Sequence, residues 1–539
     1  MNVNGIVDPI EQGLKQGWDV IDGSKLTEDQ HFAADIVIIG SGAGGGISAE
    51  ELAKAGFKVI ILEMGGLRSS KDFDMEERNA YPQLYQESSA RKTKDKAITI
   101  LQGRTVGGST TVNWTTSIRT PEPTQQYWRD NFGVKLDGKD SLVPYFAKAE
   151  QRLNIHPWPV PPNANNQALL DGCKTLGWSS TTIKRNVKGC ANLGYCGMGC
   201  PINAKQSMLV TTIPGALNLK AKLISNLHVE KLNWANDQVV GVEALTLDQD
   251  FQRRNSVKVT LTAKHYILSA GAMGSPAILL RSKAPDPSGR LGKFTYLHPV
   301  VISGAIMPEP VNGHSGAPQS IYSDEFLFGR REEQGVSGPM GYKLEVPPIH
   351  PILIGSKMLG YGEAHGALMK QFNHFQVMLA LMRDGFHQDS VGGSVELSDA
   401  GDPILDYPIS DYLWDGMRQA HLNMVKLQFA AGATSVFPIH KQAIQYTSLE
   451  QATDAINQLS YENYWTSVVS AHVMGGCNMG EDVTKSVVNS FGAHHQLQNL
   501  SVFDGSVFPT SLGANPQLSI YGLTYRNVER LIQKMRILA

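Results

Sequence analysis

The spaced glycines of DIVIIGSGAGGGISAEELAKAGFKVIILEMG, residues 35–65, have the clearest chemical meaning in this chain. Gly40 permits a tight turn, Gly42 lets the backbone approach a pyrophosphate, and Gly45 lets a helix pack closely on a strand. A helix that begins near Gly44 would point its unpaired N–H groups at the phosphates. Glu63 ends the second strand, where its carboxylate can accept a ribose hydroxyl. The segment therefore predicts a dinucleotide site.

A second set of reactive side chains lies in KGCANLGYCGMGCPINAKQS, where Cys190, Cys196 and Cys200 have the spacing C-x5-C-x3-C-P. Three thiolates on a glycine-rich loop could hold a 3Fe–4S cluster, and three ligands suit that cluster better than a four-cysteine cluster or a structural zinc. Free thiols or one disulfide are the alternatives. Cys173 and Cys477 are predicted to be small buried residues.

Composition narrows the classes of function. The chain has 539 residues, 42% of them hydrophobic and 18% charged, with a net charge of −2. This balance is typical of a globular protein and argues against a nucleic-acid partner. Five cysteines indicate a reducing compartment, and we find neither a secretory leader nor an apolar run of about 18 residues. The sequence predicts a cytoplasmic protein, with association at the inner membrane through a partner left open.

The elements that must position these residues recur along the chain. Strand–turn–helix patterns occur at 35–65, Lys264–Ser282 and Leu500–Ala539. Units so widely separated predict an α/β fold with a doubly wound core interrupted by insertions. In the largest insertion, Gly393–Leu397 is predicted as a strand and Leu368–Met382 as a helix. The predicted domains are an N-terminal helical extension (1–30), a nucleotide-binding domain (31–150, 201–300 and 465–539), a cysteine-containing region (151–200) and a substrate domain (301–464).

Five further motifs resemble the signatures of the glucose–methanol–choline oxidoreductases and occur in that family's order. They are GRTVGGSTTVN (103–113), GAMGSPAILLRS (271–282), LGKFTYLHP (291–299), AHVMGGCNMG (471–480) and LSVFDGSVFPTSLGANPQ (500–517). Lys283 and Gly476 depart from the usual glycine and threonine. The resemblance implies an FAD-binding Rossmann-like domain with an inserted substrate domain of mixed sheet and helix. It also implies an alcohol-oxidising flavoenzyme.

The resemblance implies FAD contacts along most of the chain. The loop Gly107–Asn113 would lie against the isoalloxazine ring, and Val112 stands where some relatives have a histidine that tethers FAD, so we expect non-covalent binding. The predicted cofactor residues are Gly40, Gly42, Ala43, Gly44, Gly45, Glu63, Met64, Gly103, Arg104, Gly107, Gly108, Ser109, Asn113, Trp114, Thr115, Val229, Ala270, Gly271, Asp504, Gly505, Asn515, Gln517 and Leu518.

His472 and Asn515 match the family's catalytic pair. A neutral imidazole can accept the hydroxyl proton of an alcohol as hydride leaves the carbinol carbon. Asn515 precedes Pro516, so it could both cap a helix and donate its amide to the substrate oxygen. That helix would direct its positive end at the flavin.

Three functions follow from the resemblance. The first is oxidation of a primary, medium- or long-chain or aromatic alcohol to the aldehyde. The second is the catalytic flavin subunit of a sugar or polyol dehydrogenase, similar in its cysteine loop to subunits that carry a 3Fe–4S centre. The third is a flavin-binding protein that has lost catalysis, or a non-redox lyase that uses flavin only structurally; the retention of His472 and Asn515 argues against it. The electron acceptor is left open by the sequence: an acceptor protein, a quinone, a dye or oxygen could reoxidise the flavin.

Overall fold

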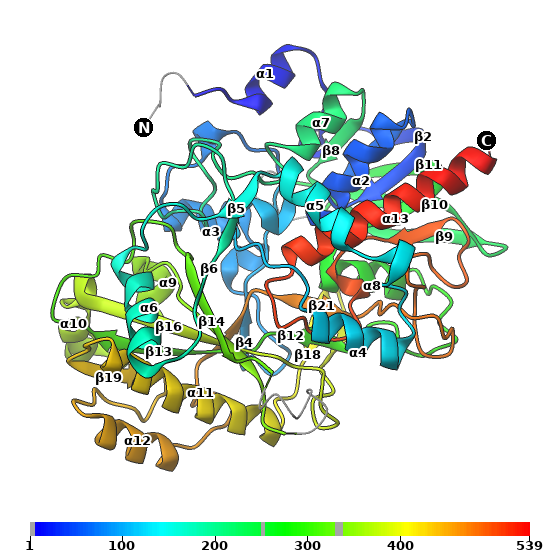
Figure 1. Ribbon diagram of the computed structural model, residues 1–539. Helices are drawn as coiled ribbons and strands as arrows, with labels where there is room; N and C mark the ends of the chain where they lie inside the picture. Colours follow the sequence, from blue (N-terminus) through cyan, green and yellow to red (C-terminus); the bar gives the residue numbers. More distant parts are fainter. Residues whose placement is uncertain (1–5, 249–253, 329–337, 539) are drawn as a thin grey trace.

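Two sheets of eight strands each organise the molecule, which we describe from a computed structural model (Figure 1). The structure describes residues 6–248, 254–328 and 338–538. Parts of three predicted domains lie outside this range: residues 1–5, 249–253, 329–337 and 539. The glycine-rich segment belongs to the first sheet. The second sheet is formed mainly by residues 300–438 and is also joined by strands from residues 98–100, 181–182 and 468–470. The domain limits given above stay a prediction.

The first sheet has a parallel core. Its strands run in the order β1 (Asp19–Asp22), β8 (Lys222–Ser225), β3 (Val59–Leu62), β2 (Gln30–Ile39), β11 (Arg254–Leu268), β10 (Gln238–Leu247) and β9 (Leu227–Ala235). β22 (Leu500–Val502) pairs in parallel with the end of β11. The carboxyl ends of β2, β11 and β22 therefore meet at one edge, where parallel α/β sheets bind their ligands.

Helices from distant segments cover this sheet. α2 (Ala43–Lys54) contacts both α7 (Thr212–Asn218) and α13 (Gln517–Leu538), and α13 also packs on α5 (Val143–Arg152). α8 (Gly271–Arg281) follows β11 and contacts β9. Figure 1 shows α13, in red, running alongside α2 and α5, in blue and cyan. The last helix of the chain, α13, therefore lies in the same helical layer as α2, the helix that follows the first glycine-rich turn.

The second sheet has the order β4 (Ile98–Ile100), β20 (Val468–Ser470), β13 (Val300–Ile306), β16 (Phe375–Met382), β15 (Tyr342–Glu345), β14 (Ile321–Phe326) and β6 (Thr181–Thr182), with β19 (Ser435–Pro438) beside β13. α11 (Asp411–Ala430) packs on β13 and β16 and is joined by α6 (Ala164–Leu176) and α12 (Leu449–Gln458). A separate apolar cluster joins the sheet to α9 (Pro351–Gly355) and α10 (Gly362–Met369).

Short elements complete the fold. They are α1 (Pro9–Lys15), α3 (Glu77–Leu84), α4 (Glu122–Phe132), β5 (Ile155–Pro157) paired with β7 (Lys184–Asn186), β12 (Thr295–Leu297) paired with β21 (Val473–Gly475), and β17 (Ser394–Leu397) paired with β18 (Pro403–Asp406). In the described residues, no helix is both long and apolar enough to cross a bilayer.

Two predicted helices differ from the structure. The helix predicted over 368–382 is wrong: α10 ends at Met369, and Phe375–Met382 forms β16, in which every residue is buried. A continuous apolar run carries no period that separates a buried strand from a buried helix. At the N-terminus, α1 ends at Lys15, just before Gly17 at φ +84°, and Asp19–Asp22 pairs with β8 instead of extending the helix.

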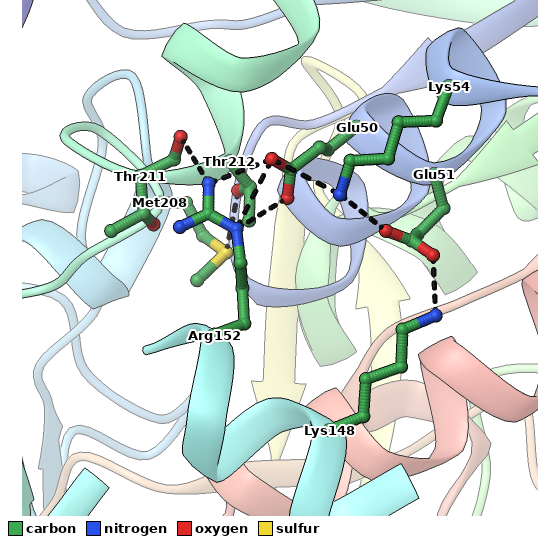
Figure 2. A network of polar contacts seen from close by, with 8 residues as sticks. All are labelled: Glu50, Glu51, Lys54, Lys148, Arg152, Met208, Thr211 and Thr212. Carbon is green, nitrogen blue, oxygen red and sulfur yellow. Dashed lines mark hydrogen bonds and ion pairs between the residues drawn. The ribbon is translucent and has the colours of Figure 1, made fainter. Parts of the chain in front are cut away.

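Charged side chains hold α2 against α5, as Figure 2 shows. Arg152 donates from Nε to Glu50 Oε2 at 2.9 Å and from Nη2 to Glu50 Oε1 at 2.8 Å, a bidentate pair. The same Nη2 donates to the carbonyl of Thr211 at 2.9 Å. The side chain of Glu50 is 5% exposed, whereas that of Arg152 is 31% exposed. The pair therefore fixes the glycine-rich helix through a largely buried carboxylate.

We expect Glu50→Gln to lower the free energy of unfolding by about 1–3 kcal/mol, because it leaves the Arg152 guanidinium without its anion in a half-buried place. The matched control is Glu51→Gln, whose carboxylate pairs with the more exposed Lys54 and Lys148 and should cost less than about 1 kcal/mol. Urea unfolding of both variants measures the difference. Equal losses would contradict the role given to Glu50.

Candidate active site

The glycine-rich turn has the close approaches that its sequence predicts. Gly40 lies at φ +100°, and a Cβ there would stand 2.3 Å from the carbonyl oxygen of Ser269. A Cβ on Gly45 would stand 1.9 Å from the carbonyl oxygen of Gly40, so the start of α2 packs directly on the turn. A Cβ on Gly42 would have no close contact, because the nearest atom, the Cα of Gly108, would be 3.8 Å from it. The backbone at Gly42 is therefore open to a neighbouring ligand.

A cavity of about 750 Å³ begins at this turn and reaches His472. Its size lies within the range of cofactor and ligand sites. Of the predicted residues it is lined by Gly40, Gly42, Ala43, Gly44, Glu63, Met64, Gly103, Arg104, Gly108, Ser109, Asn113, Trp114, Thr115, Val229, Ala270, Gly271, His472, Asp504, Gly505, Asn515 and Gln517. Gly45, Gly107 and Leu518 do not line the cavity, and neither do the three loop cysteines.

Glu63 is held by the glycine-rich turn itself. Its Oε2 accepts from Ser41 Oγ at 2.6 Å and from the Ser41 N–H at 3.0 Å, and its Oε1 accepts from the Gly65 N–H at 2.8 Å. Burial raises the pKa of this carboxyl, and these hydrogen bonds oppose the shift. A carboxylate can accept further bonds, so Glu63 remains able to bind a ribose hydroxyl.

Asp504 ties the last strand to the second glycine turn. Its Oδ2 accepts from the Gly271 N–H at 2.9 Å and from Ser275 Oγ at 2.5 Å, and its Oδ1 accepts from the Ser506 N–H at 2.8 Å. Burial raises its pKa against these bonds. The predicted turn at Asp504–Gly505 therefore lies at the cavity with its carboxylate already engaged by the protein.

The loop 107–113 is anchored from behind by Lys205, whose side chain is buried. Nζ of Lys205 donates to the carbonyls of Thr111 at 2.7 Å, Asn113 at 2.8 Å and Cys196 at 2.6 Å. Burial lowers its pKa to about 8. Three carbonyl acceptors on one ammonium fix the loop 107–113 to the cysteine loop.

The three loop cysteines are not grouped as metal ligands in the part of the chain that the structure describes, and the 3Fe–4S cluster stays a prediction. All five cysteines are free thiols, and no three His, Cys, Asp or Glu side chains among the described residues are grouped so that they could hold a metal ion. Cys190 Sγ accepts from the Asn192 N–H at 3.4 Å, and Cys196 Sγ from Arg185 Nη2 at 3.5 Å. Of the alternatives left open by the sequence, the geometry favours free thiols that stabilise the loop.

His472 lies against a second histidine. Its Nδ1 is 2.9 Å from Nδ1 of His298, and the two rings are nearly perpendicular. Nε2 of His298 accepts from the N–H groups of Leu512 at 3.3 Å and Gly513 at 3.2 Å. Burial lowers the pKa of His472 to about 4 and that of His298 well below its usual value. Both imidazoles are therefore neutral at pH 7.

Asn515 lines the same cavity but does not cap the helix. α13 begins at Gln517, and the first helical bond runs from the Ile520 N–H to the carbonyl of Pro516. Asn515 Nδ2 donates instead to Glu345 Oε2 at 3.3 Å, and its Oδ1 is buried without a partner among the described residues. Gln517 Oε1 accepts from Asn113 Nδ2 at 2.7 Å, which joins α13 to the loop 107–113.

The end of the cavity at His472 has two different walls. Apolar side chains from β13, β16 and β20 form one of them, together with Trp114; they are Val300, Leu379, Leu381 and Val469. Thr116, Gln319 and Glu345 form the other. An apolar chain with a polar end matches this arrangement.

Sequence reasoning missed three residues here. His298 lies in LGKFTYLHP, a segment already recognised as a motif, so a signal for it existed. Lys205 and Glu345 carry no local pattern that predicts their place, because each meets the site only through contacts between distant segments.

The lining residues fit FAD. An open glycine turn at a helix start suits a pyrophosphate, and the loop 107–115 offers backbone at the far end, beside His472. The unpartnered Oδ1 of Asn515 gives that end a buried acceptor that no described protein group satisfies.

Comparisons with known proteins give a consistent result. Two family models described as GMC oxidoreductase match residues 81–300 and 389–524. An uncharacterized GMC-type oxidoreductase from Sinorhizobium fredii is 28% identical over 508 residues, which cover 94% of this chain and 96% of that protein. A long-chain-alcohol oxidase from Arabidopsis thaliana is 27% identical over 532 residues, which cover 93% of this chain and 68% of that protein.

Solved structures share the fold. Formate oxidase from Aspergillus oryzae superposes with a TM-score of 0.70 at 15% identity and covers 95% of this chain and 100% of its own. Pyridoxine 4-oxidase from Mesorbium loti has a TM-score of 0.66 at 19% identity, with coverage of 92% and 98%. The predicted architecture, an α/β nucleotide-binding core with an inserted region of mixed sheet and helix, is thereby confirmed.

Proposed function

Because this chain belongs to the glucose–methanol–choline (GMC) family of FAD-dependent oxidoreductases, we propose that it oxidises an alcohol to the aldehyde with FAD bound non-covalently. The chemistry that FAD supplies when bound is acceptance of the hydride from the carbinol carbon. The observation that carries the proposal is a half-buried, neutral His472 at the far end of the cavity that begins at the glycine turn. Val112, where a tethering histidine would stand, supports the non-covalent binding.

In this proposal His472 accepts the hydroxyl proton of the alcohol. An alcohol is far too weak an acid to lose that proton unaided at pH 7, whereas a neutral imidazole within reach can take it. Asn515 holds the same oxygen through its amide. The apolar wall of Val300, Leu379, Leu381 and Val469 favours an alcohol with an apolar body, and the long-chain-alcohol oxidase relative points the same way.

The experiment is anaerobic mixing of the flavin-loaded protein with a panel of alcohols. We expect primary alcohols of medium and long chain to bleach the flavin absorbance and to yield the aldehyde. No bleaching by any alcohol would refute the proposal. The alternative, an iron–sulfur subunit of a polyol dehydrogenase, requires iron in the purified protein and faster bleaching by polyols. The same protein, once reduced, also tests the electron acceptor. We compare how fast an acceptor protein, a quinone and oxygen reoxidise its flavin.

The tautomer of His472 decides whether it can act as a base. Nε2 of His298 accepts two N–H bonds, so His298 carries its proton on Nδ1 and donates it to Nδ1 of His472. Neutral His472 then carries its own proton on Nε2, which can donate to an alcohol oxygen but cannot accept from it. Base function therefore requires both histidines to change tautomer: His472 donates from Nδ1 to Nδ1 of His298, and His298 carries its proton on Nε2, which must then turn away from the N–H groups of Leu512 and Gly513.

Nitrogen-15 NMR of His472, assigned with His472→Gln, measures this exchange. We expect protonated Nε2 in the substrate-free protein and protonated Nδ1 after an unreactive alcohol such as trifluoroethanol binds. Nε2 that stays protonated with the alcohol bound would make His472 a hydrogen-bond donor, and the assignment of the base would then be wrong.

A further inference from the structure

Glu345 is a buried carboxyl group, and one of its two oxygens has no hydrogen-bond partner among the described residues. It ends β15, is 1% exposed and lines the cavity. Its Oε2 accepts from Gln319 Nε2 at 2.6 Å and from Asn515 Nδ2 at 3.3 Å. Its Oε1 has no hydrogen-bond partner among the described residues. A buried acceptor without a partner costs about 1–3 kcal/mol, so such a group in a cavity indicates a missing donor.

The protein does not supply that donor from its nearby cation. Lys343 lies two residues earlier on β15, but its ammonium pairs with Asp324 and lies over the ring of Tyr322 at 4.1 Å. Gln319, the nearer partner, is itself fixed because its Oε1 accepts from Thr116 Oγ1. Burial raises the pKa of Glu345, and the charge of Lys343 opposes that shift.

The position of Glu345 relates it to the reacting hydroxyl. Asn515 touches Glu345 through Nδ2 and keeps its other polar atom, Oδ1, unpartnered at the cavity. A substrate oxygen held by Asn515 and His472 would therefore lie close to Glu345. To reach Glu345 Oε1, a second hydrogen-bond donor on the substrate would have to lie within a few bonds of the carbinol carbon. The rest of the substrate would contact the apolar wall.

We propose that Glu345 selects alcohols that carry a second hydrogen-bond donor, a hydroxyl or a protonated amine, beside the reacting carbon. This inference rests on the proposed alcohol oxidation. The substrate is then amphipathic: an apolar tail against Val300, Leu379 and Leu381, and a head with two polar groups between His472, Asn515 and Glu345.

Three matched alcohols test this: 1-octanol, 1,2-octanediol and 2-amino-1-octanol. A hydrogen bond to a charged group contributes about 1.5–3 kcal/mol, so we expect kcat/KM for the better of the two bifunctional alcohols to exceed that for 1-octanol by about 10-fold or more. Preference for the amino alcohol indicates an ionised Glu345. Preference for the diol alone indicates a neutral one.

Two variants assign the preference to Glu345. Glu345→Leu removes the acceptor and should bring the three kcat/KM values to within about threefold of one another. Glu345→Gln keeps the shape of the side chain and removes its charge, so it should reduce the preference for the amino alcohol. If the leucine variant does not fold, the glutamine variant alone tests whether Glu345 causes the preference. As a control, Gln319→Leu removes a partner of Oε2 but leaves Oε1 in place. Loss of this partner raises the pKa of Glu345 further, so it should shift the preference from the amino alcohol toward the diol while 1-octanol remains the poorest of the three.

A second readout does not depend on turnover. Calorimetric titration with 2-aminooctane, which has no hydroxyl group, should show binding to the wild-type protein and at least tenfold weaker binding to Glu345→Gln. Flavin bleaching with unchanged ratios among the alcohols and unchanged amine binding would overturn the inference alone. Failure of every alcohol to bleach the flavin would refute the proposed function and the inference with it.

Discussion

Replacing His472 by alanine will slow reduction of the bound flavin by an alcohol by about 10²–10⁴-fold, the usual contribution of a positioned acid–base group. The imidazole lines the cavity and is neutral because burial lowers its pKa to about 4. Stopped-flow absorbance under anaerobic conditions measures the rate. FAD should remain bound to the variant, because the glycine turn that faces the phosphates is unchanged.

The control for this variant is His494→Ala. Burial also lowers the pKa of His494 to about 4, but His494 does not line the cavity. We expect its rate of flavin reduction to equal that of the wild type. A similar loss in both variants would mean that the effect is one of folding.

The lowered pKa of His472 also determines how the rate of flavin reduction depends on pH. An imidazolium cannot accept a proton, and the folded-state pKa of His472 is depressed from 6.5 to about 4. The rate of reduction should therefore stay level as the pH falls from 8 to 6 and decline only as it approaches 4. A decline centred near pH 6.5 would show that His472 is solvated or is not the group that titrates.

Gly44→Ala will destabilise the fold, and Gly42→Ala will not. A Cβ on Gly44 would stand 1.5 Å from the carbonyl oxygen of Phe503, so α2 or the segment after β22 must move. We expect a loss of about 3 kcal/mol or more in the free energy of unfolding, or no folded protein. At Gly42, φ is −69° and the nearest atom is 3.8 Å away, so a methyl group fits.

The contrast between the two variants separates folding from cofactor binding. The methyl group of Gly42→Ala points into the space beside the turn where the pyrophosphate is expected. Its unfolding in urea should resemble that of the apo wild type, while its affinity for FAD falls at least tenfold. Wild-type affinity for FAD in Gly42→Ala would show that the cofactor does not approach this turn.

Local patterns in the sequence were enough for the nucleotide-binding core. The strand predicted before Glu63 and the helix predicted to begin near Gly44 are found in the structure as β3 and α2, because a short β-branched run and a glycine turn before a helix are each encoded by neighbouring residues. The error at 368–382 arose where that encoding fails. In β16 every residue is buried and only Gln376 is polar, so the strand has no solvent-exposed polar side to mark its period.

The site could be predicted only in part for the same reason. His472 and Asn515 were found through motifs, yet the partners that orient them, His298 and Glu345, are 174 and 170 residues away along the chain. Distances of that kind depend on how the two sheets are placed against each other. Neither hydrophobic periodicity nor the spacing of neighbouring residues predicts such contacts between distant segments.

The place of β22 and α13 at the end of the chain has a consequence for synthesis. β22 pairs with β11, and α13 packs on α2, so the first sheet is not closed until residues 500–538 have left the ribosome. Domains usually fold as units during translation, from the N-terminus onward. Until then β11 lacks its partner β22 over Tyr266–Leu268, and α2 lacks the cover of α13, so we expect cofactor capture to be a post-translational event.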